Sequence, residues 1–195
     1  ETARTYNRAR ELCQQMGETL QLFSVLHGLC GAYTTQAKLL TARELGEQML
    51  SLASNIQEPP PFTAAHFALG QTLFWLGEFA LAREHVEQGI ALYNPQQHRS
   101  YAFIHGQDPG VTCLLLAATA LWNLGYPDQA RKRIREALTL AQELSHSYSL
   151  ALAPLYAGML HQFCREGPAT QERAEVVLAF SREQKVPFLL ARATI

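Results

Sequence analysis

Apolar residues recur along the chain in two alternating patterns, and both have the spacing of an α-helix. Four stretches are apolar almost throughout, at residues 20–33, 64–76, 111–124 and 150–164. Each is followed by a stretch whose apolar positions form one stripe at a period of 3.6 residues, such as Ala82, Val86 and Ile90. The first pattern predicts helices buried between neighbours, and the second predicts helices with one solvated face. The expected unit is therefore helix, turn, helix.

One alanine recurs in the second kind of stretch. Ala42, Ala82 and Ala130 align at separations of 40 and 48 residues, and Ala174 aligns 44 residues further on. We expect these alanines to be contact points where consecutive hairpins pack, so that the hairpins form a curved stack. No stretch alternates as a β-strand would, and no Asn-Gly hairpin turn occurs. The predicted fold class is all-α.

Glycine and proline mark the expected ends of these helices. Gly77 and Gly125 lie where a helix should end in a left-handed residue. Thr63 is predicted to cap one helix, and Asp108, just before a proline, is predicted to cap another. Pro154 is expected to bend its helix or delay its start.

The whole chain, residues 1–195, is predicted to be a single repeat domain and a piece of a longer protein. Residues 1–17 are expected to form the second helix of a unit whose first helix is missing, and residues 187–195 the start of a further unit. The units between them, with one insert loop at 96–110, are expected at residues 18–56, 62–95, 111–145 and 147–184.

Composition narrows the function classes. The chain has 16 basic and 17 acidic residues and a net charge of −1, so nonspecific binding to nucleic acid is not expected. The longest apolar runs are too short to span a membrane. The four cysteines lie far apart and form no C-x-x-C pair, which is typical of reduced thiols in a cytoplasmic protein.

A set of small and apolar residues resembles the tetratricopeptide (TPR) repeat. The best copy consists of Leu69, Gly70, Leu73, Gly77, Phe79, Ala82, Val86, Gly89 and Ile90, followed by Pro95. A second copy at 120–138 departs from the pattern at Ala118 and Pro127. The resemblance implies an α-solenoid of TPR-like helix-turn-helix repeats, with units of 40–48 residues instead of the usual ~34.

Other stretches resemble the C-terminal helical regions of large bacterial signalling proteins, in which a class III nucleotide cyclase or another effector precedes a P-loop ATPase module. They lie at residues 106–111, 120–130, 160–166 and 171–175. This resemblance implies a noncatalytic scaffold or sensor role in the cytoplasm, with a protein or peptide partner or another domain of the same chain. It implies no catalytic residue and no cofactor.

If the hairpins stack, one face of the first helices should line a partner-binding groove. On helical geometry this face has Phe67, Gln71, Phe74, Leu115, Thr119, Trp122, Tyr156 and Met159. Each of these side chains could equally be core, since aromatic and aliphatic residues are mostly buried. Trp75 and Trp122, each close to a Leu-Gly pair, are expected to serve packing before chemistry.

The insert supports an alternative, a small-molecule sensor with a pocket between residues 96–110 and the neighbouring first helices. Its polar candidates are His98, Arg99, Tyr101 and His105. A metal on His98, His105 and Asp108 is not predicted, because Asp108 already has a capping role and a fourth ligand is lacking.

A third hypothesis is a hydrolase, because His161 and Cys164 are three residues apart on one helix and could form a base and its nucleophile. No orienting group is evident in the sequence, so we expect no enzyme. The basic run at residues 131–135 is expected to be a solvated face.

Overall fold

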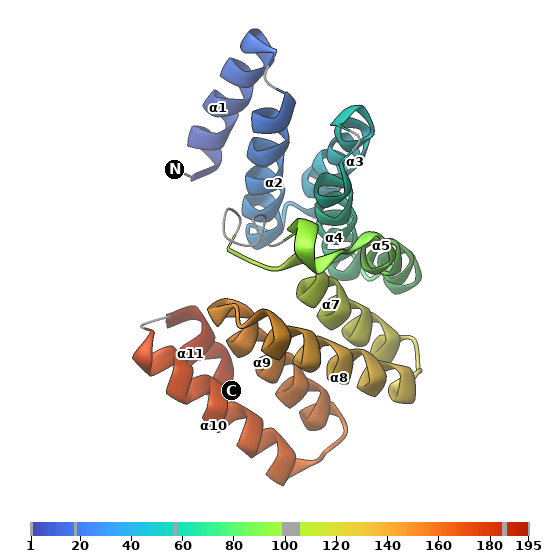
Figure 1. Cartoon of the computed structure of the whole chain (residues 1–195), viewed down its shortest axis with the longest axis vertical. Helices are drawn as coiled ribbons and strands as arrows, with labels where there is room; N and C mark the ends of the chain where they lie inside the picture. Colours follow the sequence, from blue (N-terminus) through green and yellow to red (C-terminus); the bar gives the residue numbers. More distant parts are fainter. Residues whose placement is uncertain (1, 18, 57, 99–105, 185–186, 195) are drawn as a thin grey trace. The chain divides into compact units, whose positions relative to one another are not determined.

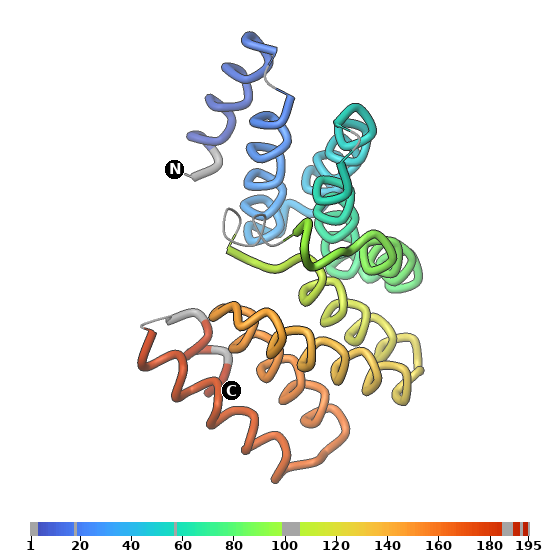
Figure 2. The backbone as a smooth tube through the Cα atoms, in the orientation of Figure 1, coloured from blue at the N-terminus to red at the C-terminus, as the bar shows by residue number. Residues whose placement is uncertain are grey.

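The structure is a computed structural model, and it describes residues 2–17, 19–56, 58–98, 106–184 and 187–194. All regular secondary structure among these residues is helical, as the sequence predicts (Figures 1 and 2). The chain divides into two compact units, residues 1–98 and residues 99–195. Each unit is described by itself.

Unit 1 consists of helices that pack in chain order. They are α1 (Thr2–Met16), α2 (Thr19–Thr35), α3 (Leu39–Ile56), α4 (Pro59–Trp75) and α5 (Phe79–Leu92). Helix α4 also contacts α2, so the first helices of consecutive hairpins lie side by side. Residues 95–98 are helical as well, where an insert loop is predicted to begin.

Unit 2 repeats this arrangement. Its helices are α7 (Pro109–Asn123), α8 (Pro127–Leu144), α9 (Ser147–Phe163), α10 (Gly167–Glu183) and the short α11 (Pro187–Ala193). Helix α9 packs on α8 and contacts α7, and α11 packs on α10 and contacts α9.

The same turn joins the two helices of each hairpin. The amide of the residue before each second helix donates a 2.9 Å hydrogen bond to the carbonyl five residues earlier; the pairs are Lys38–Tyr33, Glu78–Leu73, Tyr126–Leu121 and Glu166–His161. The preceding residue has positive φ in every case: Ala37 (58°), Gly77 (82°), Gly125 (84°) and Arg165 (59°). This is the Schellman ending of a helix, and it fixes the repeat spacing at 40, 48 and 40 residues.

The turns correct the alignment of the last unit. Ala42, Ala82 and Ala130 are each the fourth residue of their helix and are fully buried. The fourth residue of α10 is Thr170, so Ala174 lies one helical turn beyond the position predicted for it.

The alanines lie at a contact between the two helices of one hairpin, whereas the predicted contact is between consecutive hairpins. A Cβ on Gly70 of α4 would lie 3.2 Å from the carbonyl oxygen of Ala82, and Cys30 Sγ of α2 lies 3.4 Å from that of Ala42. The buried alanines therefore let the two helices of one hairpin approach. Consecutive hairpins meet one turn later, where a Cβ on Gly46 would lie 3.0 Å from Leu69 Cδ1.

One local prediction fails, one fails in part and one holds. Thr63 does not cap α4, because the helix begins at Pro59, where the missing amide hydrogens of prolines are tolerated. Pro154 does not delay α9, which begins at Ser147 and continues through it. Asp108 caps α7 as predicted, with its carboxylate accepting a 2.9 Å hydrogen bond from the amide of Val111.

The left-handed conformation of Ala37 gives a stability prediction. We expect Ala37→Gly to stabilise unit 1 by about 0.5–1 kcal/mol, because glycine adopts positive φ without a Cβ clash. Ala32→Gly, inside α2, should instead destabilise by about 1 kcal/mol. Urea unfolding followed by far-UV circular dichroism measures both changes, and a loss of stability in Ala37→Gly would contradict the assigned turn.

Candidate functional site

The predicted groove residues of unit 1 lie at partly exposed positions. Phe67, Gln71 and Phe74 are all half-buried on α4. The ring of Phe74 lies 5.4 Å from that of Trp75 in an edge contact and 5.2 Å from that of Phe79. Trp75 is 59% exposed, so it is a surface side chain and not the packing residue we predict.

Two predicted groove residues of unit 2 are buried. Leu115 is 1% exposed and Thr119 is 8% exposed, and the Thr119 hydroxyl donates a 2.9 Å hydrogen bond to the carbonyl of Leu116 in its own helix. These two side chains pack inside the protein and do not offer a surface to a partner.

Trp122, unlike these two buried residues, is partly exposed. Its ring is half-buried and stacks on Phe163 of α9, with centroids 5.9 Å apart and planes 18° apart. Phe163 is 46% exposed. The pair joins the ends of two first helices, α7 and α9, and leaves part of an aromatic surface open to solvent.

Of the two groove residues predicted on α9, Met159 matches a groove position of α7 and Tyr156 does not. The 40-residue spacing between the two turns of unit 2 places Leu155, Met159 and Gln162 at the positions of Leu115, Thr119 and Trp122. Met159 thus corresponds to Thr119, whereas Tyr156 lies one residue after Leu155, which corresponds to Leu115. Both Met159 and Tyr156 are half-buried.

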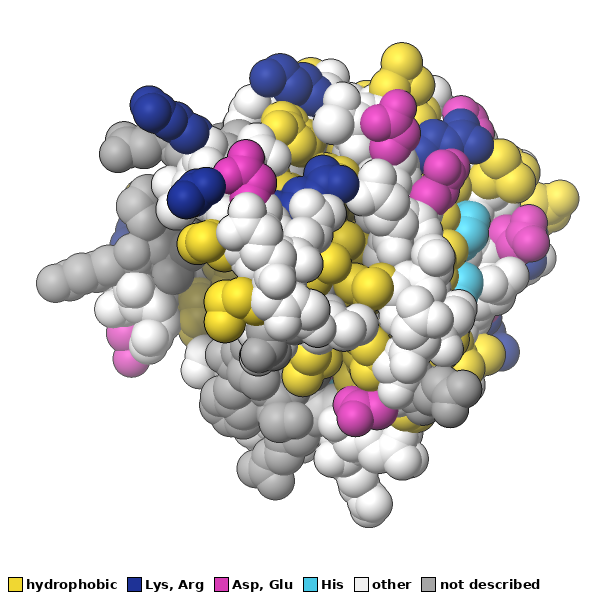
Figure 3. Space-filling model, turned by 90° about the horizontal axis from the view of Figure 1, so that it is seen from above, with side chains coloured by type: hydrophobic (Ala, Val, Ile, Leu, Met, Phe, Trp, Pro, Cys, Tyr) yellow, Lys and Arg dark blue, Asp and Glu magenta, His cyan; other side chains and the backbone are white. Residues whose placement is uncertain are grey.

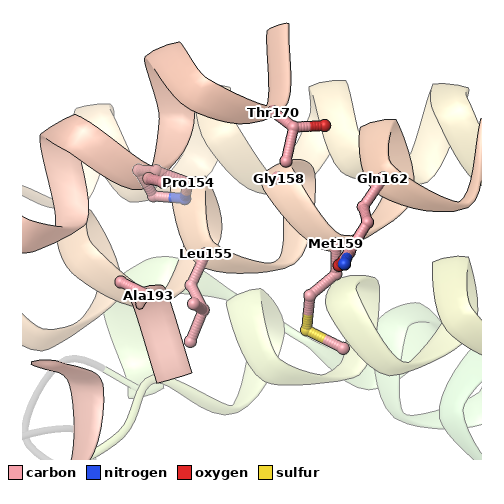
Figure 4. A pocket seen from close by; sticks show the side chains of 8 residues that line it. Pro154, Leu155, Gly158, Met159, Gln162, Thr170 and Ala193 are labelled. Carbon is pink, nitrogen blue, oxygen red and sulfur yellow. The ribbon is translucent and has the colours of Figure 1, made fainter. Parts of the chain in front are cut away.

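This face of α9 borders a small cavity of about 70 Å³ between α9, α10 and α11 (Figure 4). We call it the α9–α11 opening, and it is lined by Pro154, Leu155, Gly158, Met159, Gln162, Thr170, Ala174 and Ala193. Figure 4 shows Leu155 and Met159 along α9, with Thr170 on one side and Ala193 on the other. Among the described residues, none of the lining side chains is charged.

The polar end of the opening lies at the turn between α9 and α10. A shallow surface depression there is lined by Gln162, Arg165, Glu166, Gly167, Thr170 and Gln171, and it shares Gln162 and Thr170 with the opening. The Glu166 carboxylate accepts a 2.5 Å bond from the Arg131 guanidinium and lies 2.6 Å from His161 Nδ1. These two partners, Arg131 above all, lower the pKa of Glu166 to about 2.

Unit 1 has an ion pair at the corresponding position. Arg43 of α3 lies 3.2 Å from Glu78, which is the residue before the next second helix, just as Arg131 pairs with Glu166. Both pairs are 35 residues apart in the chain and join consecutive hairpins. The network at Glu166 therefore has a structural counterpart.

This observation bears on the hydrolase hypothesis. The structure supplies the orienting carboxylate that the sequence does not reveal, because His161 bonds to Glu166. The same carboxylate also binds Arg131, which is typical of an ion-pair network. Cys164 is a half-buried free thiol.

The predicted insert is described only in part. His98 is fully buried, with Nε2 3.1 Å from the hydroxyl of Thr63 and Nδ1 2.7 Å from the carbonyl oxygen of Asn94. It is therefore buried within unit 1. Arg99, Tyr101 and His105 lie outside the described residues, so the small-molecule hypothesis stays a prediction. Within the described ranges, no cluster of three or more metal-ligating side chains is found.

A histidine pair is the feature that the sequence does not reveal. His66 of α4 and His85 of α5 place their Nδ1 atoms 3.1 Å apart, and His66 is 8% exposed. Burial and the charge of His85 lower the pKa of His66 to about 4. The pKa of His85 is also lowered, mainly by burial. Figure 3 shows histidine atoms reaching the surface beside acidic side chains.

No model of a known protein family matches the chain, and no curated protein sequence does. Solved structures of other proteins share its fold. BtubC from P. vanneervenii matches with a TM-score of 0.71 at 17% identity, over 93% of this chain and 73% of that chain. A putative kinesin light chain from Podosopora anserina, with nearly identical TPR-like repeats, matches with a TM-score of 0.62 at 16% identity, over 93% of this chain and 95% of that chain.

The apo form of RapI matches with a TM-score of 0.63 at 14% identity. The alignment covers 95% of this chain and 51% of RapI. At such low identities these likenesses concern the fold alone. The fold is all-α, an α-solenoid of TPR-like repeats, as the sequence predicts. In the part of the chain that the structure describes, every helix is too short or too polar to cross a membrane.

Proposed function

We propose that this chain is a noncatalytic protein-interaction module that binds a partner polypeptide on unit 2. The binding surface consists of the Trp122–Phe163 stack and the neighbouring α9–α11 opening with Met159 and Gln162. The proposal rests on one observation above all: a stacked aromatic pair with an exposed face lies at the ends of two adjacent first helices. Exposed aromatic side chains next to an apolar depression are typical anchors of protein interfaces.

The composition of this surface favours a polypeptide over other ligands. The described residues that line the opening are uncharged, and its volume of about 70 Å³ is small for an organic cofactor. The near-neutral charge of the chain also offers no broad basic surface for phosphate polymers. Binding energy would come from a few apolar anchors, with Gln162 and Thr170 as hydrogen-bonding partners.

We further propose that the module works in the cytoplasm as a scaffold or sensor within a larger bacterial signalling protein. The resemblance of residues 106–111 and 120–130 to repeats in such proteins supports this context, as does the absence of a C-x-x-C pair. The partner would then be another protein or a neighbouring domain.

Trp122→Ala tests the proposed surface. Peptides selected from a random display library on the wild-type chain should lose at least about tenfold in affinity, or about 1.4 kcal/mol, because the variant removes the aromatic anchor. Fluorescence anisotropy measures the affinities. Trp75→Ala is the matched control, since it removes an exposed tryptophan from unit 1. Equal affinities of wild type and Trp122→Ala, with helicity unchanged, would rule out this surface.

A further inference from the structure

His66 of α4 and His85 of α5 bring two ring nitrogens together inside unit 1. Their Nδ1 atoms lie 3.1 Å apart, their ring centroids lie 5.3 Å apart, and their planes differ by 37°. The two imidazoles therefore face each other through these nitrogens. A neutral imidazole nitrogen that carries no hydrogen is the commonest metal ligand in proteins.

The packing of α4 on α5 holds the pair in this position. Gly70 lies one helical turn after His66, and a Cβ there would lie 3.6 Å from His85 Cβ and 2.6 Å from Val86 Cγ1. His66 is 8% exposed, and Val86, which follows His85, is fully buried. Two imidazoles on helices in such close contact are preorganised ligands, because little side-chain freedom remains to be lost when an ion binds.

The separation of the two nitrogens fits a transition metal. Zn²⁺ binds imidazole nitrogen at about 2.0–2.1 Å. Two nitrogens at that distance lie about 2.9 Å apart when they subtend a right angle at the metal, and about 3.3 Å apart at the tetrahedral angle. The observed 3.1 Å lies between these two values. An ion can therefore replace the proton that the pair shares without driving the two nitrogens apart.

The charges that act on His85 favour a cation. The carboxylates of Glu84 on α5 and Glu47 on α3 act on it electrostatically, and so does the guanidinium of Arg43 on α3. Arg43 is itself paired with Glu47 at 3.1 Å and with Glu78 at 3.2 Å. These ion pairs offset the repulsion from Arg43, and Glu84 adds an attraction.

We propose that His66 and His85 bind one divalent transition-metal ion through their Nδ1 atoms. The site belongs to unit 1 and does not depend on partner binding by unit 2. Imidazole nitrogen suits Zn²⁺, Cu²⁺ and Ni²⁺, whereas Mg²⁺ and Ca²⁺ take oxygen ligands. The described residues contain no group of three or more metal-ligating side chains, so water completes the coordination. The ion is therefore exchangeable, unlike the zinc of a closed four-ligand structural site.

Metal binding changes the tautomer of one ring. In the metal-free pair one Nδ1 donates its hydrogen to the other, so one ring is protonated at Nδ1 and its partner at Nε2. When both Nδ1 atoms bind an ion, the first ring loses its proton from Nδ1 to solvent and takes one up at Nε2, so no net proton is released. The ion links α4 to α5, and the stability of this hairpin then rises with the metal concentration.

Isothermal titration calorimetry of the whole chain with Zn²⁺, at about pH 7.5 where imidazole is neutral, tests the proposal. We expect stoichiometric binding in wild type and at least tenfold weaker binding in His85→Asn, which lacks one of the two ligands. His27→Asn is the matched control, because it removes a half-buried histidine from α2 of the same unit, and it should bind like wild type. Zn²⁺ should raise the Tm of wild type and of His27→Asn but not that of His85→Asn.

The nitrogen resonances of the wild-type chain test the site without any variant, and they decide alone if His85→Asn does not fold. In the ¹⁵N-labelled protein, Zn²⁺ should shift the Nδ1 resonances of His66 and His85 and leave both rings protonated at Nε2. Zn²⁺ held by a free thiol such as Cys164 would leave these resonances unchanged, and this outcome overturns the proposal. So does a His85→Asn chain that binds Zn²⁺ as tightly as wild type, or a wild-type Tm that Zn²⁺ does not raise.

Discussion

Replacing Gly70 by leucine is expected to destabilise unit 1 by about 3 kcal/mol. A Cβ at this position would lie 2.6 Å from Val86 Cγ1 and 3.2 Å from the carbonyl oxygen of Ala82. Val86 is fully buried and, being β-branched in a helix, has essentially one favourable rotamer, so it cannot move aside. The rest of the leucine side chain then forces α4 and α5 apart, which costs more than the roughly 0.8 kcal/mol gained in helix propensity.

Gly31→Leu provides the opposite case in a neighbouring hairpin. Gly31 lies inside α2, and a Cβ there would meet nothing within 4 Å. Only the propensity gain remains, so this variant should be more stable than wild type by about 0.5–1 kcal/mol. Urea denaturation followed by far-UV circular dichroism compares the two variants. A Gly70→Leu protein as stable as wild type would mean that α4 and α5 are not in close contact.

The recurrence of small residues is what made the fold predictable. Ala42, Ala82 and Ala130 recur because the backbones of two helices approach within each hairpin, a requirement that leaves a visible mark on the sequence. The last hairpin escapes this signal, because Thr170 occupies the alanine position on α10; a Cβ on Gly158 of α9 would lie 3.9 Å from the carbonyl oxygen of Thr170. A sequence search for alanine alone therefore finds Ala174, one turn too late.

Only two of the four hairpin turns can be predicted from the sequence. Gly77 and Gly125 identify two helix ends, because glycine adopts positive φ readily. Ala37 and Arg165 adopt the same conformation, at a cost that the hydrogen bonds of the turn and the packing of the hairpin offset. Neither alanine nor arginine is typical of positive φ, so the sequence does not predict these two turns.

The sequence predicts which candidate residues share one face of a helix, but not which of them are exposed. Helical spacing identifies Trp122 and Met159 on one face, and the structure places both at or near the open surface of unit 2. The same spacing selects Leu115 and Thr119, which are buried, because every residue of α7 from Pro109 to Leu121 is buried and helical spacing does not distinguish the residues of such a run. The stacking partner Phe163 was missed, although it lies four residues after Met159 and seven after Tyr156 and so shares the face expected for α9.

The His66–His85 pair is expected to make unit 1 less stable by about 2 kcal/mol at pH 4.5 than at pH 7. A hydrogen bond between two Nδ1 atoms needs one donor and one acceptor, so the pair observed at 3.1 Å holds a single Nδ1 proton. A second proton would place two donors face to face and a charge in a mostly buried place. Burial, then the charge of His85, accordingly lowers the pKa of His66 from 6.5 to about 4.

Charges on the neighbouring helices modulate this effect. His85 faces Glu84 on its own helix and Arg43 and Glu47 on α3; the two carboxylates raise its pKa and Arg43 lowers it, while burial dominates and the net shift is downward. Arg43 and Glu47 are themselves paired at 3.1 Å. The acids therefore do not restore ordinary protonation to the pair.

The direction of the pH effect follows from the lowered pKa. Between pH 6.5 and about 4 an unfolded chain protonates His66 whereas the folded chain does not, so stability falls as the pH falls through this window and changes little further below it.

His66→Asn keeps a hydrogen-bonding group near Nδ1 but cannot titrate, so the difference in stability between pH 7 and pH 4.5 should shrink by about 2 kcal/mol. Thermal and urea unfolding at both pH values, with a chelator present to exclude a metal bridging the two imidazoles, measure it. An undiminished difference in His66→Asn would show that the folded chain protonates His66 as readily as the unfolded chain does, and the close Nδ1 contact would then not govern the acid response.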